Sequence, residues 1–325
     1  MIPDLKVRRM GMPRLYATTA NLAATGVFDE SRLVPTAQPG SCGMLPWAAG
    51  LCLLLIFAEG RLTFAAESAL PAAVEVRRYD APEATQAVAV DGAYFYAIGD
   101  DVIAKYAKST GTLCKRWKAS DDVPLEHLNS GIVQDGKLYA AHSNYPHYPD
   151  ASSVEIWDTE TLEHVDSHSF GIYEGSLTWI DWHDESWWAV FAHYTEKIND
   201  DPYAKDARWT SLVRFDPQWH REAGWTFPEE VIARFQPDSC SGGTWESDRL
   251  YCTGHDRGEL YELVRPEGGA TLRLVRTIRV PITGQGIAWD RDEPRTLYGI
   301  DRPRRQVVVA RLPFLTTAEL NGKIP

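Results

Sequence analysis

The sequence predicts an all-β protein, folded as a five-bladed β-propeller that is closed by an N-terminal strand. Three observations carry this prediction. A unit of recurring strands is repeated along the chain, an aromatic residue marks the second strand of each unit, and tight polar turns join the first strand to the second. Together they favour one ring of similar blades over a set of separate domains.

The repeat is aligned by an aromatic residue near the start of each second strand. The five anchors are Tyr96, Tyr139, Trp188, Tyr251 and Tyr298. They lie 43, 49, 63 and 47 residues apart, whereas a four-stranded blade needs about 40–50 residues. The longest interval therefore holds one insertion.

A first strand precedes each anchor. These strands are expected at 87–90, 130–133, 176–180, 242–245 and 286–289. Turns such as Asp91-Gly92 and Asp135-Gly136 follow them, which is typical of hairpins. A third strand with its turn recurs at 105–113, 156–165 and 214–222. Most tryptophans, including Trp179, Trp188, Trp245 and Trp289, fall at strand positions and are expected to pack between blades.

The last unit lacks a fourth strand, because only thirteen residues follow the strand at 307–312. The alternating segment 74–81 can take that place and close the ring, so that no sheet edge stays unpaired. A sixth blade built from weakly patterned segments such as 196–210 is the structural alternative.

Residues 1–66 have the features of an export signal, and 67–325 are expected to form the single propeller domain. Arginines come first, then the apolar run 45–58, then small residues at 63–66 that suit cleavage. Fourteen apolar residues are too few for a stable membrane span. The stretch before Met44 is long for a signal, so the chain could start at Met10, Met12 or Met44, and an uncleaved anchor is the alternative. An extracytoplasmic location, periplasmic or secreted, is expected.

The charge of the chain argues against nucleic acid and anionic lipid as partners. The whole chain has a formal net charge of −12. Residues 1–66 hold six basic and four acidic residues, so the remainder carries −14. Nucleic acid and anionic lipid are therefore not expected as partners. The protein is expected to be a monomer that binds a small molecule or a glycan. Cys240 and Cys252 are spaced so that they could pair across a hairpin and leave Cys114 free, and the alternative is that all three cysteines are buried thiols in strands.

Propeller geometry brings the starts of the first strands and the ends of the second strands to one face, around the mouth of the central channel. Three histidines, His142, His193 and His255, end the second strands of three consecutive blades. Imidazoles converging from separate blades suit a divalent metal such as Zn²⁺ or Mn²⁺, with Ca²⁺ as a further alternative. Glu174 or Gln285 could supply an oxygen ligand or orient the histidine ligands. Hydrogen bonding of each histidine at its own strand end is the competing interpretation.

Other polar residues are expected at the same mouth. Glu174 and His127 are candidates for moving a proton. The candidate substrate-binding residues come from the strand starts, the strand ends and the loops beyond them, namely Gln86, Asn129, Tyr145, Tyr148, Trp209 and Asp301. Alternatively, Glu174 with Asp100 or Asp301 could form the acid–base pair of a glycoside hydrolase.

Several stretches carry a resemblance to known propellers. The segments 127–133, 138–146, 152–164, 167–181, 250–256 and 284–294 resemble a group of secreted bacterial propeller proteins, mostly uncharacterised and sometimes labelled cycloisomerase-like. This similarity covers nearly all of 80–311 and implies the fold and export. More distantly, the run Gly284-Gln285-Gly286-Ile287 is similar to a repeat of plant-type glutaminyl cyclases, which are five-bladed propellers, but no catalytic residue is transferred from them.

Two functional hypotheses follow. The first is an exported, metal-assisted enzyme of the lyase, cyclase or isomerase type, acting on a small carboxylated or sugar-derived substrate. The second is a non-catalytic propeller that binds a glycan or a protein on the same face, through Tyr145, Tyr148 and Trp209.

Overall fold

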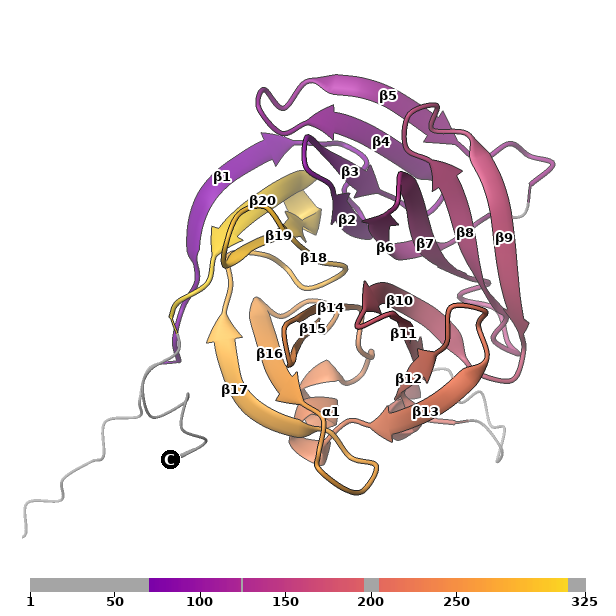
Figure 1. Ribbon diagram of the computed structural model, residues 1–325, viewed down its shortest axis with the longest axis vertical. Coiled ribbons are helices and arrows are strands. Elements are labelled where there is room, and N and C mark those ends of the chain that lie inside the picture. The colour runs from indigo at the N-terminus through magenta and orange to yellow at the C-terminus, as the bar shows by residue number, and fades with distance from the viewer. Residues whose placement is uncertain (1–69, 124, 196–204, 315–325) are drawn as a thin grey trace, which may run out of the picture. The chain divides into compact units, whose positions relative to one another are not determined.

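A computed structural model describes residues 70–123, 125–195 and 205–314, and within them it shows a five-bladed β-propeller (Figure 1). Five antiparallel sheets of four strands surround a central axis. The predicted fold class is therefore confirmed. The expected signal in residues 1–66 lies outside the described residues, and among those described no helix is long and apolar enough to cross a membrane.

The first four blades follow one another along the chain, each with its first strand innermost. The first blade is β2 (Ala87–Val90), β3 (Tyr94–Ile98), β4 (Val102–Ala107) and β5 (Leu113–Lys118). The second is β6 (Leu128–Gln134), β7 (Lys137–Ser143), β8 (Ser152–Asp158) and β9 (His164–Gly171). The third is β10 (Ser176–His183), β11 (Ser186–Ala192), β12 (Ser211–Phe215) and β13 (Arg221–Thr226). The fourth is β14 (Gly242–Glu246), β15 (Arg249–Thr253), β16 (Glu259–Val264) and β17 (Arg273–Arg279).

The fifth blade joins the two ends of the propeller, as the sequence predicts. It consists of β18 (Ala288–Trp289), β19 (Thr296–Asp301) and β20 (Gln306–Arg311), with β1 (Val74–Asp80) as its outermost strand. The pairing of β1 with β20 runs from Val74 opposite Arg311 to Asp80 opposite Gln306. An ion pair between Arg78 and Asp301, 2.7 Å from Nη1 to Oδ2, ties β1 to the end of β19.

The core lies between neighbouring blades. One cluster joins Trp179 and Trp188 of the third blade to Trp245 of the fourth, and all three are buried. Burying one such ring removes roughly 200 Å² from water, which stabilises the fold by at most about 5 kcal/mol. The expected inter-blade role of these tryptophans is confirmed.

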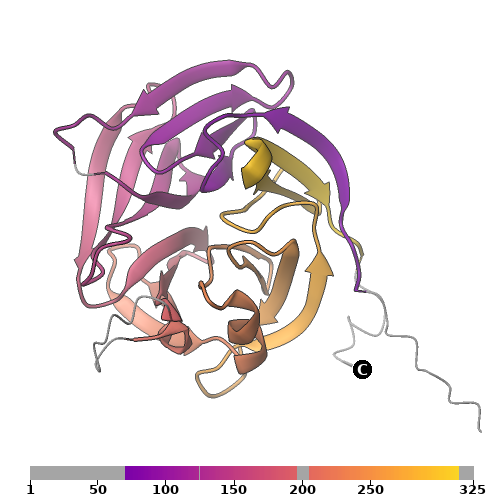
Figure 2. The ribbon, with the colours of Figure 1, turned by 180° about the vertical axis from the view of Figure 1, so that it is seen from behind.

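The helix α1 (Glu229–Phe235), which lies between the third and fourth blades in the chain, was not predicted from the repeat pattern. Its buried side chains Val231, Ile232 and Phe235 belong to the same inter-blade cluster as the tryptophans. In the view from behind, α1 lies on the face turned toward the reader (Figure 2). The segment that follows it enters the mouth of the channel.

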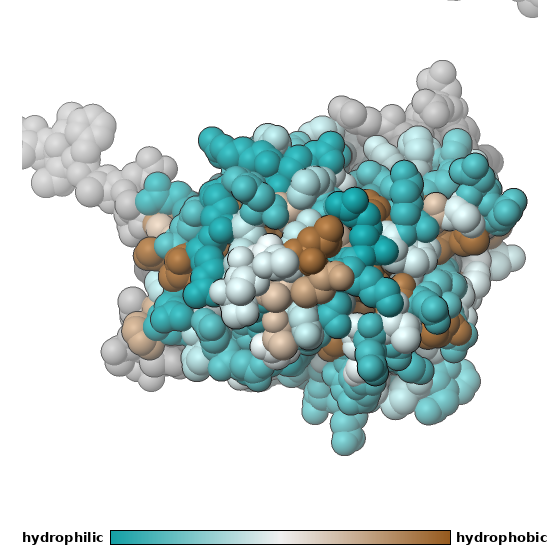
Figure 3. Space-filling model, turned by 90° about the horizontal axis from the view of Figure 1, so that it is seen from above, coloured by the Kyte–Doolittle hydropathy of each residue, from teal (hydrophilic) through white to brown (hydrophobic). Residues whose placement is uncertain are grey.

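The outer strands give the propeller a largely hydrophilic edge. Five of the six residues of β5 are exposed. Seen from above, hydrophobic side chains appear on this side only in small separate groups (Figure 3). This side of the edge therefore has no extended hydrophobic surface.

Candidate functional site

Loops from all five blades meet on one face of the ring, which we call the mouth face. It holds the starts of β2, β6, β10, β14 and β18 and the ends of β3, β7, β11, β15 and β19. The 3₁₀ turn Arg302–Arg304, which follows β19, lies on this face with helix α1 (Figure 2). The predicted site residues come from these loops and strand ends.

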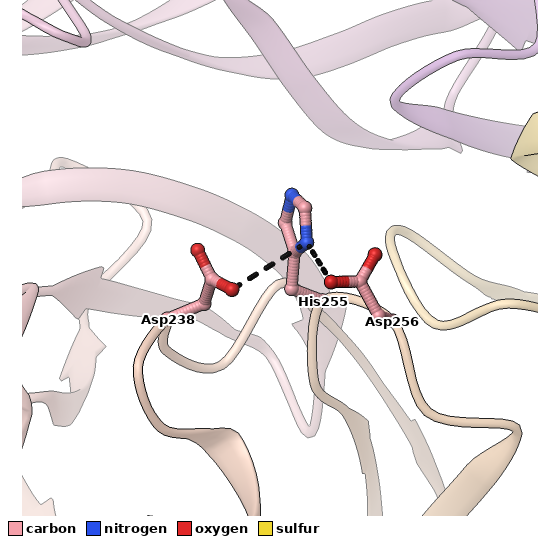
Figure 4. A group of neighbouring side chains, drawn as sticks. All are labelled: Asp238, His255 and Asp256. Carbon is pink, nitrogen blue, oxygen red and sulfur yellow. Dashed lines mark ion pairs between the residues drawn. The ribbon is translucent and has the colours of Figure 1, made fainter.

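His255 lies between two carboxylates on the mouth face, and we call these three residues the Asp–His–Asp group (Figure 4). Nδ1 of His255 is 2.9 Å from Oδ2 of Asp256 and 3.6 Å from Oδ2 of Asp238. One potential ligand atom from each residue lies within 4.8 Å of the others. In the described ranges, it is the only cluster of three or more His, Cys, Asp or Glu side chains with metal-binding spacing.

The backbone explains why these residues meet. Helix α1 ends at Phe235, and the next few residues carry Asp238 toward β14. His255 follows β15 after Gly254, and a Cβ at Gly254 would lie 3.1 Å from the Phe235 ring. The missing side chain lets the loop after β15 approach the end of α1, which brings His255 to Asp238.

The two ring nitrogens of His255 have different surroundings. Nε2 is 3.0 Å from Nη1 of Arg302, which donates a hydrogen bond to it. Nδ1 is buried and has no hydrogen-bond partner, although it faces Asp256 and Asp238. A buried ring nitrogen that faces two carboxylates without a hydrogen bond is suited to binding a cation.

A second polar group lies across the mouth face, on the side of the first blade. Nδ1 of His127 is 2.7 Å from Oδ1 of Asp100, which also accepts a 2.8 Å hydrogen bond from Nε2 of Gln86. Burial opposes ionisation of Asp100, but the contacts with His127 and Gln86 and the charge of Arg302 outweigh it, so its pKa is lowered. Asp100 is therefore a carboxylate at neutral pH that fixes the orientation of His127.

Aromatic residues connect this group to the third blade. The ring of Tyr145 lies 5.0 Å from that of His127 and 5.3 Å from that of Tyr194. Burial raises the pKa of Tyr194, which hydrogen-bonds Ser176 and interacts with the charge of Asp238. Tyr145 and Tyr194 therefore lie between the Asp100–His127 pair and Asp238 of the Asp–His–Asp group.

His193 and His142 occupy other surroundings. His193 is buried, with Nδ1 3.7 Å from Oδ2 of Asp150. Nδ1 of His142 is 3.0 Å from Oγ of Ser153, which donates to Glu155. Burial lowers the pKa of His142, and its Nε2 has no hydrogen-bond partner. The three predicted histidines do not come together in one cluster, and only His255 belongs to the Asp–His–Asp group.

Three more predicted residues are held by their neighbours. Glu174 pairs with Arg221 of the outermost strand β13 at 3.4 Å. Asn129 donates to the carbonyl of Leu177. Burial raises the pKa of Asp301, but Arg304 and Arg78 donate to its carboxylate, and the net shift is downward. These three contacts bind parts of the propeller to one another.

The other predicted residues differ in exposure. Gln285 is buried, with a backbone φ of 67° and an Nε2 that has no partner. Tyr148 and Trp209 are exposed. Cys240 and Cys252 are buried free thiols, and Cys114 is an exposed one.

Sequence reasoning missed Asp238, Asp256 and Arg302. Asp256 directly follows His255, so that pair was visible as a dipeptide. Arg302 directly follows Asp301, the predicted end of a second strand. Asp238 left no signal, because its place depends on a helix that the repeat pattern does not contain.

Comparisons with known proteins support the fold. No family model matches the sequence, and no curated protein matches it. Among solved structures, a glutaminyl cyclase from Myxococcus xanthus superposes with a TM-score of 0.50 at 12% identity, covering 75% of this chain and 98% of that one. U3-55K (TM-score 0.42, 10% identity, 74% and 100% coverage) and the WD40 repeats of RRP9 (0.40, 13%, 70% and 79%) are more distant. At these identities the likeness shows the propeller fold alone.

Proposed function

We propose that the protein is an exported enzyme of the lyase, cyclase or isomerase type, which uses a divalent metal ion bound by Asp238, His255 and Asp256. The observation that carries the proposal is the buried Nδ1 of His255, which lacks a hydrogen-bond partner and faces both carboxylates. The substrate would be a small carboxylated or sugar-derived molecule at the mouth face.

The donor set fits a borderline transition metal. Two carboxylates and one imidazole suit Zn²⁺ or Mn²⁺, whereas Ca²⁺ prefers oxygen ligands alone. Three protein ligands leave coordination positions for water or substrate. A bound metal would polarise a substrate carbonyl or carboxylate.

Arg302 would bind a substrate carboxylate next to the proposed metal ligands. Its guanidinium lies 3.0 Å from Nε2 of His255, and its charge acts on Asp100 across the mouth. It also lines an open groove of about 900 Å³, together with Arg116 and Asp256. A guanidinium fork binds carboxylates through two parallel hydrogen bonds, so Arg302 would fix the orientation of an acidic substrate.

His127 is the candidate for moving the proton. Its Nδ1 is engaged by Asp100, which leaves Nε2 to accept or donate a proton. The Tyr145 ring lies against the imidazole and restricts its rotation. Glu174, the other predicted proton carrier, is paired with Arg221 and has less support.

The competing carboxylate mechanism is also less well supported. Glycoside cleavage needs one carboxyl group that is protonated near neutral pH. Asp100 and Asp301 both have lowered pKa values, and Glu174 forms an ion pair. A cyclase, by contrast, is compatible with the fold, because the M. xanthus protein with this fold is a glutaminyl cyclase.

Metal content tests the proposal directly. We expect the chain from Glu67 onward, purified without chelators, to hold about one equivalent of Zn²⁺ or Mn²⁺, since three ligands bind one ion. The His255→Ala variant should lose it, because the only nitrogen ligand of the group is removed. Elemental analysis measures both, and turnover of small carboxylated sugars and lactones should stop when the metal is chelated.

His220→Ala is the matched control. His220 also lies 2.8 Å from a carboxylate, that of Asp216, but on an exposed turn between β12 and β13. This variant should retain the metal. A wild-type protein that holds no metal even after reconstitution, or a His255→Ala variant that keeps it, would contradict the proposal.

A further inference from the structure

Three large aromatic side chains are exposed on the mouth face, away from the Asp–His–Asp group. Tyr148, Tyr173 and Trp209 are 57%, 84% and 59% exposed. They come from the loop between β7 and β8, the connection from β9 to β10, and the 3₁₀ turn Ala207–Trp209 before β12. Large aromatic side chains are costly to expose to water, and those exposed beside a polar pocket favour ligand binding.

A small pocket lies beside these rings. It has a volume of about 80 Å³, and Tyr148, Ile172 and Tyr173 are among the residues that line it. Its polar lining is buried, because Asp150 and His193, whose Oδ2 and Nδ1 atoms lie 3.7 Å apart, are both nearly inaccessible to solvent. The pocket therefore combines aromatic surfaces with a carboxylate and an imidazole.

The position of His193 depends on a glycine. Gly175 has a φ of +127°, and a Cβ there would lie 2.8 Å from Nε2 of His193. Only a glycine lets the connection from β9 to β10 pass this close to the imidazole. The backbone at Gly175 therefore helps to hold His193 beside Asp150.

The pocket lining also includes a positive charge. Lys205 lines the pocket, and its Nζ lies 5.6 Å from the centre of the Trp209 ring. The ammonium group lies at the edge of the pocket, where it can meet an anionic substituent of a ligand.

We propose that this pocket is a subsite for one residue of an acidic glycan, with Tyr173 and Tyr148 stacking on the sugar ring. Asp150 and His193 bind hydroxyl groups at the edge of the ring, and Lys205 binds the carboxylate of a uronic acid. The pocket is large enough only for the edge of the sugar ring, and the face of the sugar lies on the exposed rings of Tyr173 and Tyr148. The subsite does not depend on a metal, so it can exist even if the metal hypothesis fails.

The test is glycan binding by the metal-stripped protein. Binding is screened on an array of neutral and acidic glycans and then titrated with an oligogalacturonate and a neutral cello-oligosaccharide. We expect the oligogalacturonate to bind more tightly. Tyr173→Ala should weaken its binding about tenfold, whereas Tyr173→Phe should retain it because the ring face is unchanged. Lys205→Met should remove the preference for the acidic sugar.

Phe314→Ala is the matched control. Phe314 is also an exposed aromatic residue, but it follows the C-terminal end of β20 and does not line the pocket. It should leave binding unchanged. The proposal is overturned if no glycan on the array binds, if Tyr173→Ala binds as well as wild type, or if the neutral sugar binds as tightly as the acidic one.

Discussion

The imidazole of His255 has two ring nitrogens and, when neutral, a single ring proton. Arg302 at Nε2 and a metal ion at Nδ1 each need a nitrogen without the proton, so the two would compete. As long as Arg302 donates to Nε2, the proton resides on Nδ1. A metal ion could bind Nδ1 only after the proton has left that nitrogen, so the proton would move to Nε2, where it would face the guanidinium of Arg302. Binding of the proposed metal would therefore release Arg302, which would become free to bind a substrate carboxylate.

This competition predicts that Arg302→Met binds metal more tightly than wild type. A hydrogen bond from a charged donor contributes about 1.5 kcal/mol, so its removal should tighten the metal dissociation constant about tenfold. Titration calorimetry with Mn²⁺ or Zn²⁺ measures the change, and turnover of an acidic substrate should fall in the same variant.

Arg305→Met is the control for Arg302→Met, because Arg305 follows the same turn but donates to the carbonyl of Pro82. Its metal affinity should equal that of wild type. Unchanged or weaker metal binding by Arg302→Met would show that the guanidinium and the metal do not compete.

At the scale of the strands, the blades meet tightly near the axis. A Cβ on Gly286 would lie 2.3 Å from the Cβ of Ala87, and the Gly286 amide donates to the carbonyl of Gln86 at 2.9 Å. The fifth and first blades therefore contact each other through backbone here. This contact completes the inner circle of strands.

We expect Gly286→Ala to lower the free energy of unfolding by about 3 kcal/mol, as overpacking of a core does. Chemical denaturation measures it. Gly268→Ala, where a Cβ meets nothing within 4 Å, should change stability by less than about 0.5 kcal/mol. The double variant Ala87→Gly/Gly286→Ala should recover part of the loss, and equal stability of Gly286→Ala and wild type would refute the close contact.

The arrangement of the strands could be predicted from the sequence, but the directions of side chains at the strand ends could not. Hairpins, blade count and the closing strand were predictable, because local turn chemistry and strand alternation set them. The directions of the three histidines were not. β7 continues through His142 to Ser143, whereas β11 ends before His193 and β15 ends two residues before His255. A shift of one residue moves a side chain to the other face of its strand. The spacing of the histidines along the sequence therefore does not determine which way their side chains point.

The candidate site was less predictable than the fold for a related reason. Its parts depend on side chains from loops and on helix α1, whose seven residues are stabilised by packing between blades rather than by a long amphipathic pattern. His255, His127 and Tyr145 were identified from their positions near strand ends. Asp238 depends on tertiary contacts that a single sequence does not contain.

At the scale of the whole molecule, the ring depends on its N-terminal strand. The expected cleavage after residue 66 leaves seven residues before Val74, so a processed chain would retain β1. We expect protein exported by a bacterial host to begin at Glu67, as measured by its mass. A chain that begins at Ala81 should unfold at a lower temperature, because β20 becomes an unpaired edge.

A peptide of residues 70–82 should restore thermal stability to the chain that begins at Ala81, since it supplies the missing strand in trans. A peptide of the same composition in scrambled order is the control. Equal melting temperatures of the chains that begin at Glu67 and Ala81 would show that β1 does not hold the ring closed.

The pairing of Val74 with Arg311 places the start of the first strand beside the end of the last one. Adjacent strands lie about 4.8 Å apart, so a few residues would suffice to join them. The order of the blades around the ring would then not depend on where the chain starts and ends. The protein is thus suited to circular permutation, with new termini in the tight turns opposite the mouth face, where they would leave the proposed metal ligands and the proposed glycan subsite unchanged.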